Sequence, residues 1–428
     1  MPASVLEWLA AARAGGMVSL SQDRTVSPIV DVPVITPFLN RLGLASTRNL
    51  LLLAGTAFCL SFGMAAQNAV GNNFQVETLQ MTAGDRGIME GGRELPGLLL
   101  VFISALTVAV PVPRLAAICI VTMAVQYLGY SFVGDVWQLI GLTVFGSIGF
   151  HMWMPLQREL NLSIGDKSRS GRALGLMAGI GSAGGLTGMG LVYAFAPSLG
   201  YRTMFYWAFI GLTIGAALVA FVKSPRAPGE EKRARFVIRR EYGFYYLLTF
   251  LEGSARQIWG SFAMFTLVKN FGIDVRTVTA MLIINSLLTT FLNPKIGVWI
   301  DQWGERRALM VGYAGLIVVF LIFALNANPW VAIAIFFAYS AMFAFNMATP
   351  SYLHKIARPG ELSPSLAMGV TFEHLAGVAI PIVGGMLWVT YGYTYAFLVG
   401  AFVAMICFAA VTRLPKGRLI RAGSAAGN

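Results

Sequence analysis

Hydrophobic residues arrive in long runs that short polar stretches separate, and this pattern repeats along most of the chain. A hydrocarbon core about 30 Å thick is crossed by about 20 helical residues, and the runs reach that length. A window of about 19 residues therefore predicts twelve transmembrane helices and an all-α membrane protein. Their expected ranges are 50–70, 84–110, 114–132, 136–156, 172–195, 203–223, 243–266, 276–299, 308–326, 329–349, 364–388 and 391–412.

Six predicted helices lie on each side of a polar, charged segment, 224–242, which we interpret as a linker between two halves. A shift of about 192 residues places Phe58 on Phe250, and the few such matches favour an internal duplication. Duplicated halves that enclose a site near the middle of the membrane are typical of transporters. The expected organisation is a cytoplasmic tail 1–48, a first half 49–223, the linker, a second half 243–412 and a cytoplasmic tail 413–428.

Composition and charge support this interpretation. The 428 residues are 57% hydrophobic and 12% charged, which excludes a soluble enzyme of this size. The net charge of +12 comes mostly from Lys and Arg on the side of the two tails. The positive-inside rule then predicts cytoplasmic termini and a multi-pass protein of a bacterial inner membrane or of a membrane derived from it. On the opposite side we expect only Arg86, Arg93, Arg202, Lys269 and Arg276.

A loop motif lies between the eighth and ninth predicted helices. The run 297–307, GVWIDQWGERR, resembles the loop motif of the major facilitator superfamily. The resemblance implies a transporter that works by alternating access. It also implies that Asp301, Arg306 and Arg307 tie helix ends together on the cytoplasmic side as a gate. The alternative is a surface ion pair between Asp301 and Arg306 without a gating role.

Two departures weaken the implied gate. Gln302 and Glu305 stand where the family usually has basic residues. The corresponding first-half loop keeps Arg114 but has Ala109 in place of the carboxylate.

A narrower resemblance involves segments 73–97 and 250–272. They are similar to segments of superfamily members from magnetosome membranes, for which iron transport is the proposed role. The resemblance implies iron as cargo and a magnetosome location.

Ionisable residues fall inside several predicted helices, where each is costly unless it faces a cavity or a partner. We predict that these residues bind substrate or protons. In the second helix they share one face, unless that helix begins only at Pro96 and leaves them in an outer loop. In the seventh helix, the alternative is an ion pair that merely joins two helices. The candidates are Glu90, Arg93, Glu94, Glu252, Arg256, Glu373 and His374.

Counting these charges favours a cation. The candidates include four carboxylates and two arginines. If each arginine forms one ion pair, two carboxylates and one imidazole are left without a positively charged partner. A divalent metal prefers oxygen and imidazole ligands, which Glu373 and His374 would supply with one carboxylate of the second helix. His151, near the end of the fourth helix, is interpreted as a hydrogen-bonded structural residue.

The function expected is therefore secondary active transport of a metal cation such as iron, with proton coupling through Glu373 and His374. One alternative is proton-coupled efflux of organic cations or drugs, and another is a membrane scaffold that transports nothing. An anion held by Arg93 and Arg256 is a further alternative.

Other function classes lack their motifs. No G-x-x-x-x-G-K-[ST] phosphate loop or catalytic dyad occurs, so neither ATP-driven pumping nor an enzyme is expected. We expect no cofactor and no nucleic acid, and a monomer in the lipid bilayer that binds a small molecule or ion.

Overall fold

The computed structural model describes residues 48–107, 110–162, 170–223, 238–358 and 361–414. Most of both expected tails and of the expected linker lies outside the described residues. So does the loop 163–169, which contains Lys167 and Arg169 of the expected cytoplasmic side. The described part consists of helices and connecting turns, without a strand. The expected all-α fold is confirmed.

The first half contains the helices from α3 to α9. A π-helical turn, η1, prolongs α3, and a break at Leu99 separates α4 from α5, which together make the second span. The bounds are α3 Arg48–Asn73, η1 Phe74–Thr78, α4 Ala83–Leu98, α5 Leu100–Leu106, α6 Val112–Tyr130, α7 Val136–Leu162, α8 Ser170–Leu199 and α9 Tyr201–Ala220.

Helices of the second half begin after a short 3-10 turn, η3. The tenth span is interrupted by a second 3-10 turn, η4, between α13 and α14. The bounds are η3 Arg240–Tyr242, α10 Gly243–Lys269, α11 Val275–Trp303, α12 Glu305–Leu325, α13 Pro329–Phe343, η4 Ala344–Met347, α14 Ala348–Ile356, α15 Leu362–Tyr391 and α16 Tyr393–Val411.

Twelve spans result, as the hydrophobic pattern predicts. Ten helices of the described part are long and apolar enough to cross a membrane. Two further spans complete the set. One is formed by α4 together with α5, and the other is α10, and each contains ionisable residues.

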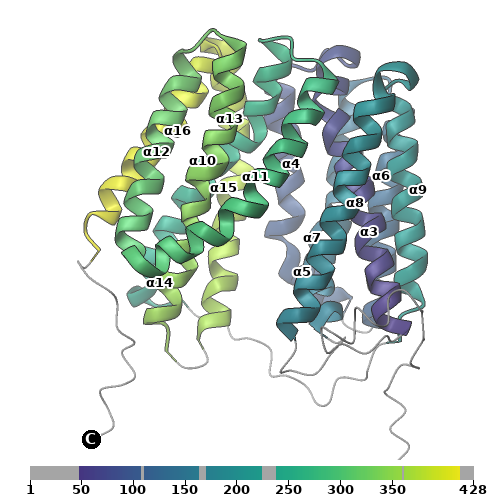
Figure 1. Ribbon diagram of the computed structural model, residues 1–428, viewed down its shortest axis with the longest axis horizontal. Coiled ribbons are helices and arrows are strands. Elements are labelled where there is room, and N and C mark those ends of the chain that lie inside the picture. The colour runs from purple at the N-terminus through teal and green to yellow at the C-terminus, as the bar shows by residue number, and fades with distance from the viewer. Residues whose placement is uncertain (1–47, 108–109, 163–169, 224–237, 359–360, 415–428) are drawn as a thin grey trace, which may run out of the picture.

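Figure 1 shows the two halves side by side, with α4 and α11 between them. We call the face where α3 begins and α16 ends the terminal face, and the opposite face, which carries residues 79–82 and 270–274, the loop face.

The start of α4 decides the place of three candidate residues. A capping box, in which Thr82 and Asp85 bond to each other's backbone, begins the helix at Ala83. The alternative in which this helix begins at Pro96 is therefore wrong. Glu90, Arg93 and Glu94 lie in α4, where helical spacing directs them to one side.

Close helix packing joins the halves near the loop face. Gly87 and Gly91 of α4 lie against the backbone of α15, and a Cβ on Gly91 would lie 2.7 Å from the carbonyl oxygen of Val378. A Cβ on Gly87 would collide with the carbonyl group of Pro381. Only glycine permits this approach, which brings the charged side of α4 next to α10 and α15.

Candidate functional site

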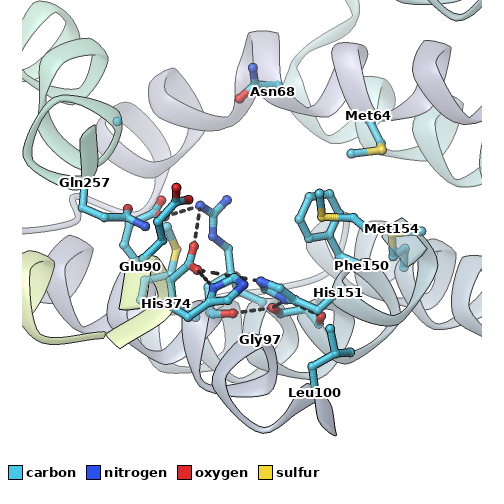
Figure 2. Close-up of a pocket in the computed structure, with 18 of the residues that line it drawn as sticks. Met64, Asn68, Glu90, Gly97, Leu100, Phe150, His151, Met154, Gln257 and His374 are labelled. Atoms are coloured by element: carbon cyan, nitrogen blue, oxygen red, sulfur yellow. Dashed lines mark hydrogen bonds and ion pairs between the residues drawn. The ribbon is translucent and has the colours of Figure 1, made fainter. Parts of the chain in front are cut away.

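A cavity of about 1300 Å³ lies between the halves. Its lining comes chiefly from α3, α4, α6 and α7 of the first half and from α10 and α15 of the second. Figure 2 shows Glu90 and His374 on one side of the open space and Met64 and Met154 on the other. Of the predicted substrate- or proton-binding residues, all but Glu252 line it: Glu90, Arg93, Glu94, Arg256, Glu373 and His374.

Hydrogen bonds between the halves close the cavity on the side of the loop face. Arg86 Nε donates to the carbonyl oxygen of Ser261 at 3.0 Å. Lys269 Nζ donates to the carbonyl oxygen of Met81 at 2.6 Å. In the other direction the lining continues to Arg158 and Pro364, near the ends of α7 and α15 that belong to the terminal face. The cavity therefore extends toward the terminal face.

A buried carboxylate on α4 lies between two guanidinium groups. Glu90 is 5% exposed, and its oxygens lie 2.9 Å from Arg86 and 3.0 Å from Arg93. Arg93 is also 3.5 Å from Glu94 Oε1. Both α4 arginines are thus paired with carboxylates, and so is Arg256 of α10, whose partner is Glu373.

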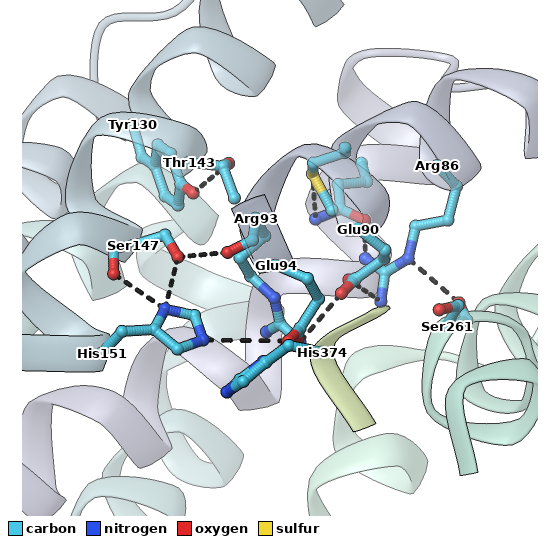
Figure 3. Close-up of polar contacts among 12 residues, drawn as sticks. Arg86, Glu90, Arg93, Glu94, Tyr130, Thr143, Ser147, His151, Ser261 and His374 are labelled. Atoms are coloured by element: carbon cyan, nitrogen blue, oxygen red, sulfur yellow. Dashed lines mark hydrogen bonds and ion pairs between the residues drawn. The ribbon is translucent and has the colours of Figure 1, made fainter. Parts of the chain in front are cut away.

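Glu94 lies between two imidazole rings (Figure 3). His374 Nδ1 of α15 lies 2.7 Å from Glu94 Oε2, and His151 Nε2 of α7 lies 3.8 Å from the same oxygen. Glu94 and His151 are buried, and His374 is mostly buried. Each of the three offers one possible metal-ligand atom, and these atoms all lie within 4.8 Å of one another. We call Glu94, His151 and His374 the carboxylate–imidazole cluster.

The contacts of the second nitrogen of His151 favour one tautomer. Nδ1 lies 2.9 Å from the carbonyl oxygen of Ser147, which can only accept a hydrogen bond, and 2.9 Å from the Ser147 hydroxyl, which donates its own proton to the carbonyl oxygen of Arg93. Both contacts favour a neutral ring with the proton on Nδ1. The lone pair of Nε2 then faces Glu94. At 3.8 Å these two atoms are too far apart for a hydrogen bond.

Adjacent residues of α15 have different partners. Glu373 forms an ion pair with Arg256 at 2.7 Å, and both side chains are partly exposed to the cavity. Neighbouring residues of a helix point about 100° apart, which explains why His374 reaches Glu94 instead. Glu373 and His374, which the sequence pairs as metal ligands, therefore do not meet at one point. His151, which the sequence analysis interprets as a structural residue, joins Glu94 and His374 in the cluster.

Glu252 lies apart from the cavity lining. It is 8% exposed, and its Oε1 accepts hydrogen bonds from the hydroxyl of Tyr313 on α12 and, at 2.6 Å, from that of Thr349 on α14. Arg256, one turn further along α10, pairs with Glu373.

The loop between α11 and α12 is built differently from the expected gate. Among the described residues, neither Asp301 nor Arg307 has an ion-pair partner, and Arg306 donates to the carbonyl oxygen of Thr412 at 2.8 Å. The carboxylate that is buried there is Glu305, which pairs with Lys355 of α14. Arg306 thus joins α12 to the end of α16, whereas a gating role of Asp301 and Arg307 stays a prediction.

Comparison with known proteins finds likeness to one family of transporters. Residues 242–425 match the profile of the Major Facilitator Superfamily. The structure of the nucleoside transporter NupG superposes with a TM-score of 0.69 at 15% identity and covers 86% of this chain and 100% of that one. The second half of the chain thus matches the model of this superfamily, and the chain has the fold of a superfamily transporter. It is a multi-pass membrane protein, and its likeness is to transporters and not to enzymes.

Two further transport proteins are similar to this chain. A bacterial homologue of the human lysosomal transporter Spinster, in an inward-facing and unoccupied conformation, gives a TM-score of 0.65 at 13% identity over 85% of this chain and 95% of its own. The multi-drug resistance efflux pump PmrA of Streptococcus pneumoniae is 24% identical over 298 residues, which are 64% of this chain and 72% of the pump. These likenesses support the superfamily fold. Iron as cargo, a magnetosome location, cytoplasmic termini and a monomeric state stay predictions.

Proposed function

We propose that this protein is a secondary transporter of the major facilitator type that moves a divalent metal cation such as ferrous iron, with proton coupling. The observation that carries the proposal is the carboxylate–imidazole cluster, whose ligand atoms lie within 4.8 Å of one another. Its members come from α4 and α7 of the first half and from α15 of the second.

The ligand chemistry suits a first-row divalent metal. Two imidazoles and one carboxylate are common ligands of such ions. His151 is oriented as a ligand would be, because its Nδ1–H donates to the carbonyl oxygen of Ser147 and leaves Nε2 free. Three protein ligands leave further positions for water, so the cargo can exchange.

Alternating access follows from where the ligands are attached. When the halves rock apart near the loop face, His374 moves away from Glu94 and His151, and a metal bound by all three loses a ligand. The hydrogen bonds Arg86–Ser261 and Lys269–Met81 must break in the same movement. The cluster thus binds cargo with three ligands when the loop face is closed, and with fewer ligands when the halves separate there. A polar cavity between the halves that extends toward one face also argues against a scaffold without transport.

The orientation proposed has the terminal face in the cytoplasm of a bacterial inner membrane or of a membrane derived from it. The described basic residues at helix ends of that face support it, among them Lys223, Arg306, Lys355 and Arg413.

Histidine variants test the metal site. The chain has three histidines, and exposed His354 supplies a matched control. His151→Gln and His374→Gln should each lower the affinity for ferrous iron, measured anaerobically on purified protein, by about tenfold or more, because each removes one ligand. His354→Gln should bind as the wild type does.

Transport in proteoliposomes completes the test. A pH gradient should drive ferrous iron flux in the wild type and in His354→Gln, and flux should fall to the level of protein-free liposomes in the two cluster variants. Wild-type binding and flux in His151→Gln and His374→Gln would contradict the metal proposal.

A second candidate function is efflux of organic cations. The cavity of about 1300 Å³ is far larger than an ion, and methionines, whose flexible side chains suit varied apolar ligands, line it. They are Met64, Met89, Met123, Met154 and Met368. The partial likeness to the efflux pump PmrA agrees with this candidate. Ethidium export that neither metals nor His151→Gln affect would favour it over the metal cargo.

A further inference from the structure

Glu252 differs from the other carboxylates of the transmembrane helices in its partners. Glu90 and Glu94 lie beside arginines, and Glu373 is paired with Arg256. No cation lies within ion-pair distance of Glu252 among the described residues, although its side chain is buried. A buried carboxylate that only neutral hydroxyls contact requires an explanation.

Protonation has different consequences in the two environments. A carboxylate that is paired with a guanidinium loses the ion pair when it takes up a proton. Glu252 accepts both of its hydrogen bonds, from Tyr313 and Thr349, on Oε1. A proton on Oε2 leaves both bonds in place, so the site can hold either the carboxylate or the carboxylic acid.

The groups that face Glu252 do not fix its charge. Electrostatic interactions join it to Tyr313 of α12, to Cys407 of α16, to Tyr245 and Arg256 of α10 and to Glu373 of α15. The hydroxyl of Thr349 faces it from α14. Arg256 is the one cation among these groups, and its guanidinium is already paired with Glu373.

Helix α10 links Glu252 to the cargo cluster and to the closed loop face. Arg256 follows one turn later, about 6 Å along the helix, and holds Glu373, the neighbour of His374. Ser261, further along, accepts the hydrogen bond from Arg86 that joins the halves. A change of charge at Glu252 therefore acts on the Arg256–Glu373 pair and on the helix that holds the halves together.

We propose that Glu252 is the proton-binding site that couples transport to the proton gradient, and that it contributes no ligand to the cargo. The site takes up one proton on its carboxylate to give the neutral acid and releases it again, without a bond to the metal. The proposal rests on the proposed transport function, but the proton site itself can be measured without cargo.

Infrared difference spectroscopy of purified protein without metal tests the site directly. When the pH is lowered, the wild type should gain the carbonyl band of a carboxylic acid. Glu252→Gln, which keeps an oxygen acceptor for Tyr313 and Thr349, should lose this band. Glu90→Gln is the matched control, because Glu90 is a carboxylate that is paired with arginines, and this variant should retain the carbonyl band. A band unchanged in Glu252→Gln overturns the proposal.

Proteoliposomes test the coupling. Glu252→Gln should lose the accumulation of ferrous iron that a pH gradient drives, yet exchange ferrous iron across the membrane at equal concentrations as fast as the wild type. Gradient-driven accumulation at the wild-type level in this variant overturns the proposal. If the wild type carries no ferrous iron, the metal proposal fails, and the infrared band still decides whether Glu252 binds the proton.

A second variant tests the proposal if Glu252→Gln does not fold. If Glu252→Gln cannot be purified as a monodisperse protein, Thr349→Val, which keeps the carboxylate but removes one hydroxyl donor, must displace the pH midpoint of the band. An unmoved midpoint contradicts the assignment to Glu252.

Discussion

Gly97 supports the carboxylate–imidazole cluster at the scale of single residues. A Cβ on this glycine would lie 2.6 Å from His151 Cδ2 and 2.6 Å from His374 Cε1. Both distances are far below van der Waals contact, so no larger side chain fits while the rings stay in place. The spacing of the two imidazoles thus depends on a residue that offers no ligand itself.

Gly97→Ala should therefore separate the two rings and lower the affinity for ferrous iron by about tenfold, as loss of outer support does at metal sites. Gly260→Ala is the matched control, since Gly260 lines the same cavity from α10 and its Cβ would meet nothing within 4 Å. Calorimetric titration measures both variants. Equal affinity in Gly97→Ala and Gly260→Ala would count against the cluster as the metal site.

At the scale of elements, a polar contact on the terminal face joins the starts of α10 and α15. Arg239 and the Tyr242 hydroxyl donate to the carboxylate of Glu361, the latter at 2.7 Å. These hydrogen bonds hold the pKa of Glu361 below its ordinary range. A lowered pKa stabilises the folded protein above the pKa of the unfolded chain, about 4.3, and this stability is lost as the pH falls through the folded value.

Arg239→Gln should lower the melting temperature in detergent at neutral pH. Its difference from the wild type should shrink as the pH falls below the unfolded value of about 4.3 and through the lowered pKa of Glu361. Arg276→Gln is a suitable control, because Arg276 is exposed and no described residue pairs with its side chain. A difference between Arg239→Gln and the wild type that stays constant with pH would show that the contact does not depend on the charge of Glu361.

The whole molecule is closed at the loop face. Close packing of α4 on α15 and the hydrogen bonds from Arg86 and Lys269 hold the halves together there, while the cavity extends to the terminal face. In the proposed transport cycle, a rocking movement separates these contacts before cargo leaves through the loop face.

Gly87→Val should open the loop face, since its side chain would collide with Pro381 of α15. Spin labels on Thr78→Cys and Arg276→Cys, in a background without native cysteines, should report a longer distance than in the parent protein. Gly190→Val, on α8 where a Cβ meets nothing within 4 Å, is the control. An unchanged distance distribution in Gly87→Val would mean that the α4–α15 contact does not hold the loop face closed.

The helices were predictable because they follow from local properties of the chain. Length and hydropathy of each run decide whether it can span a membrane, and the twelve spans agree with that pattern. The interruptions at Leu99 and at η4 were not predicted, since a break inside an apolar run leaves little trace in hydropathy.

The sequence by itself determined the fold, the twelve spans and the rare ionisable residues within them, because the cost of polar groups in lipid acts on each helix separately. Only the tertiary structure decided which of these residues meet. Glu94 and His374 are 280 residues apart and become neighbours through the contact of α4 with α15. Glu373, adjacent to His374, points to another partner, because side-chain direction and helix packing, and not position in the sequence, determine which charges pair.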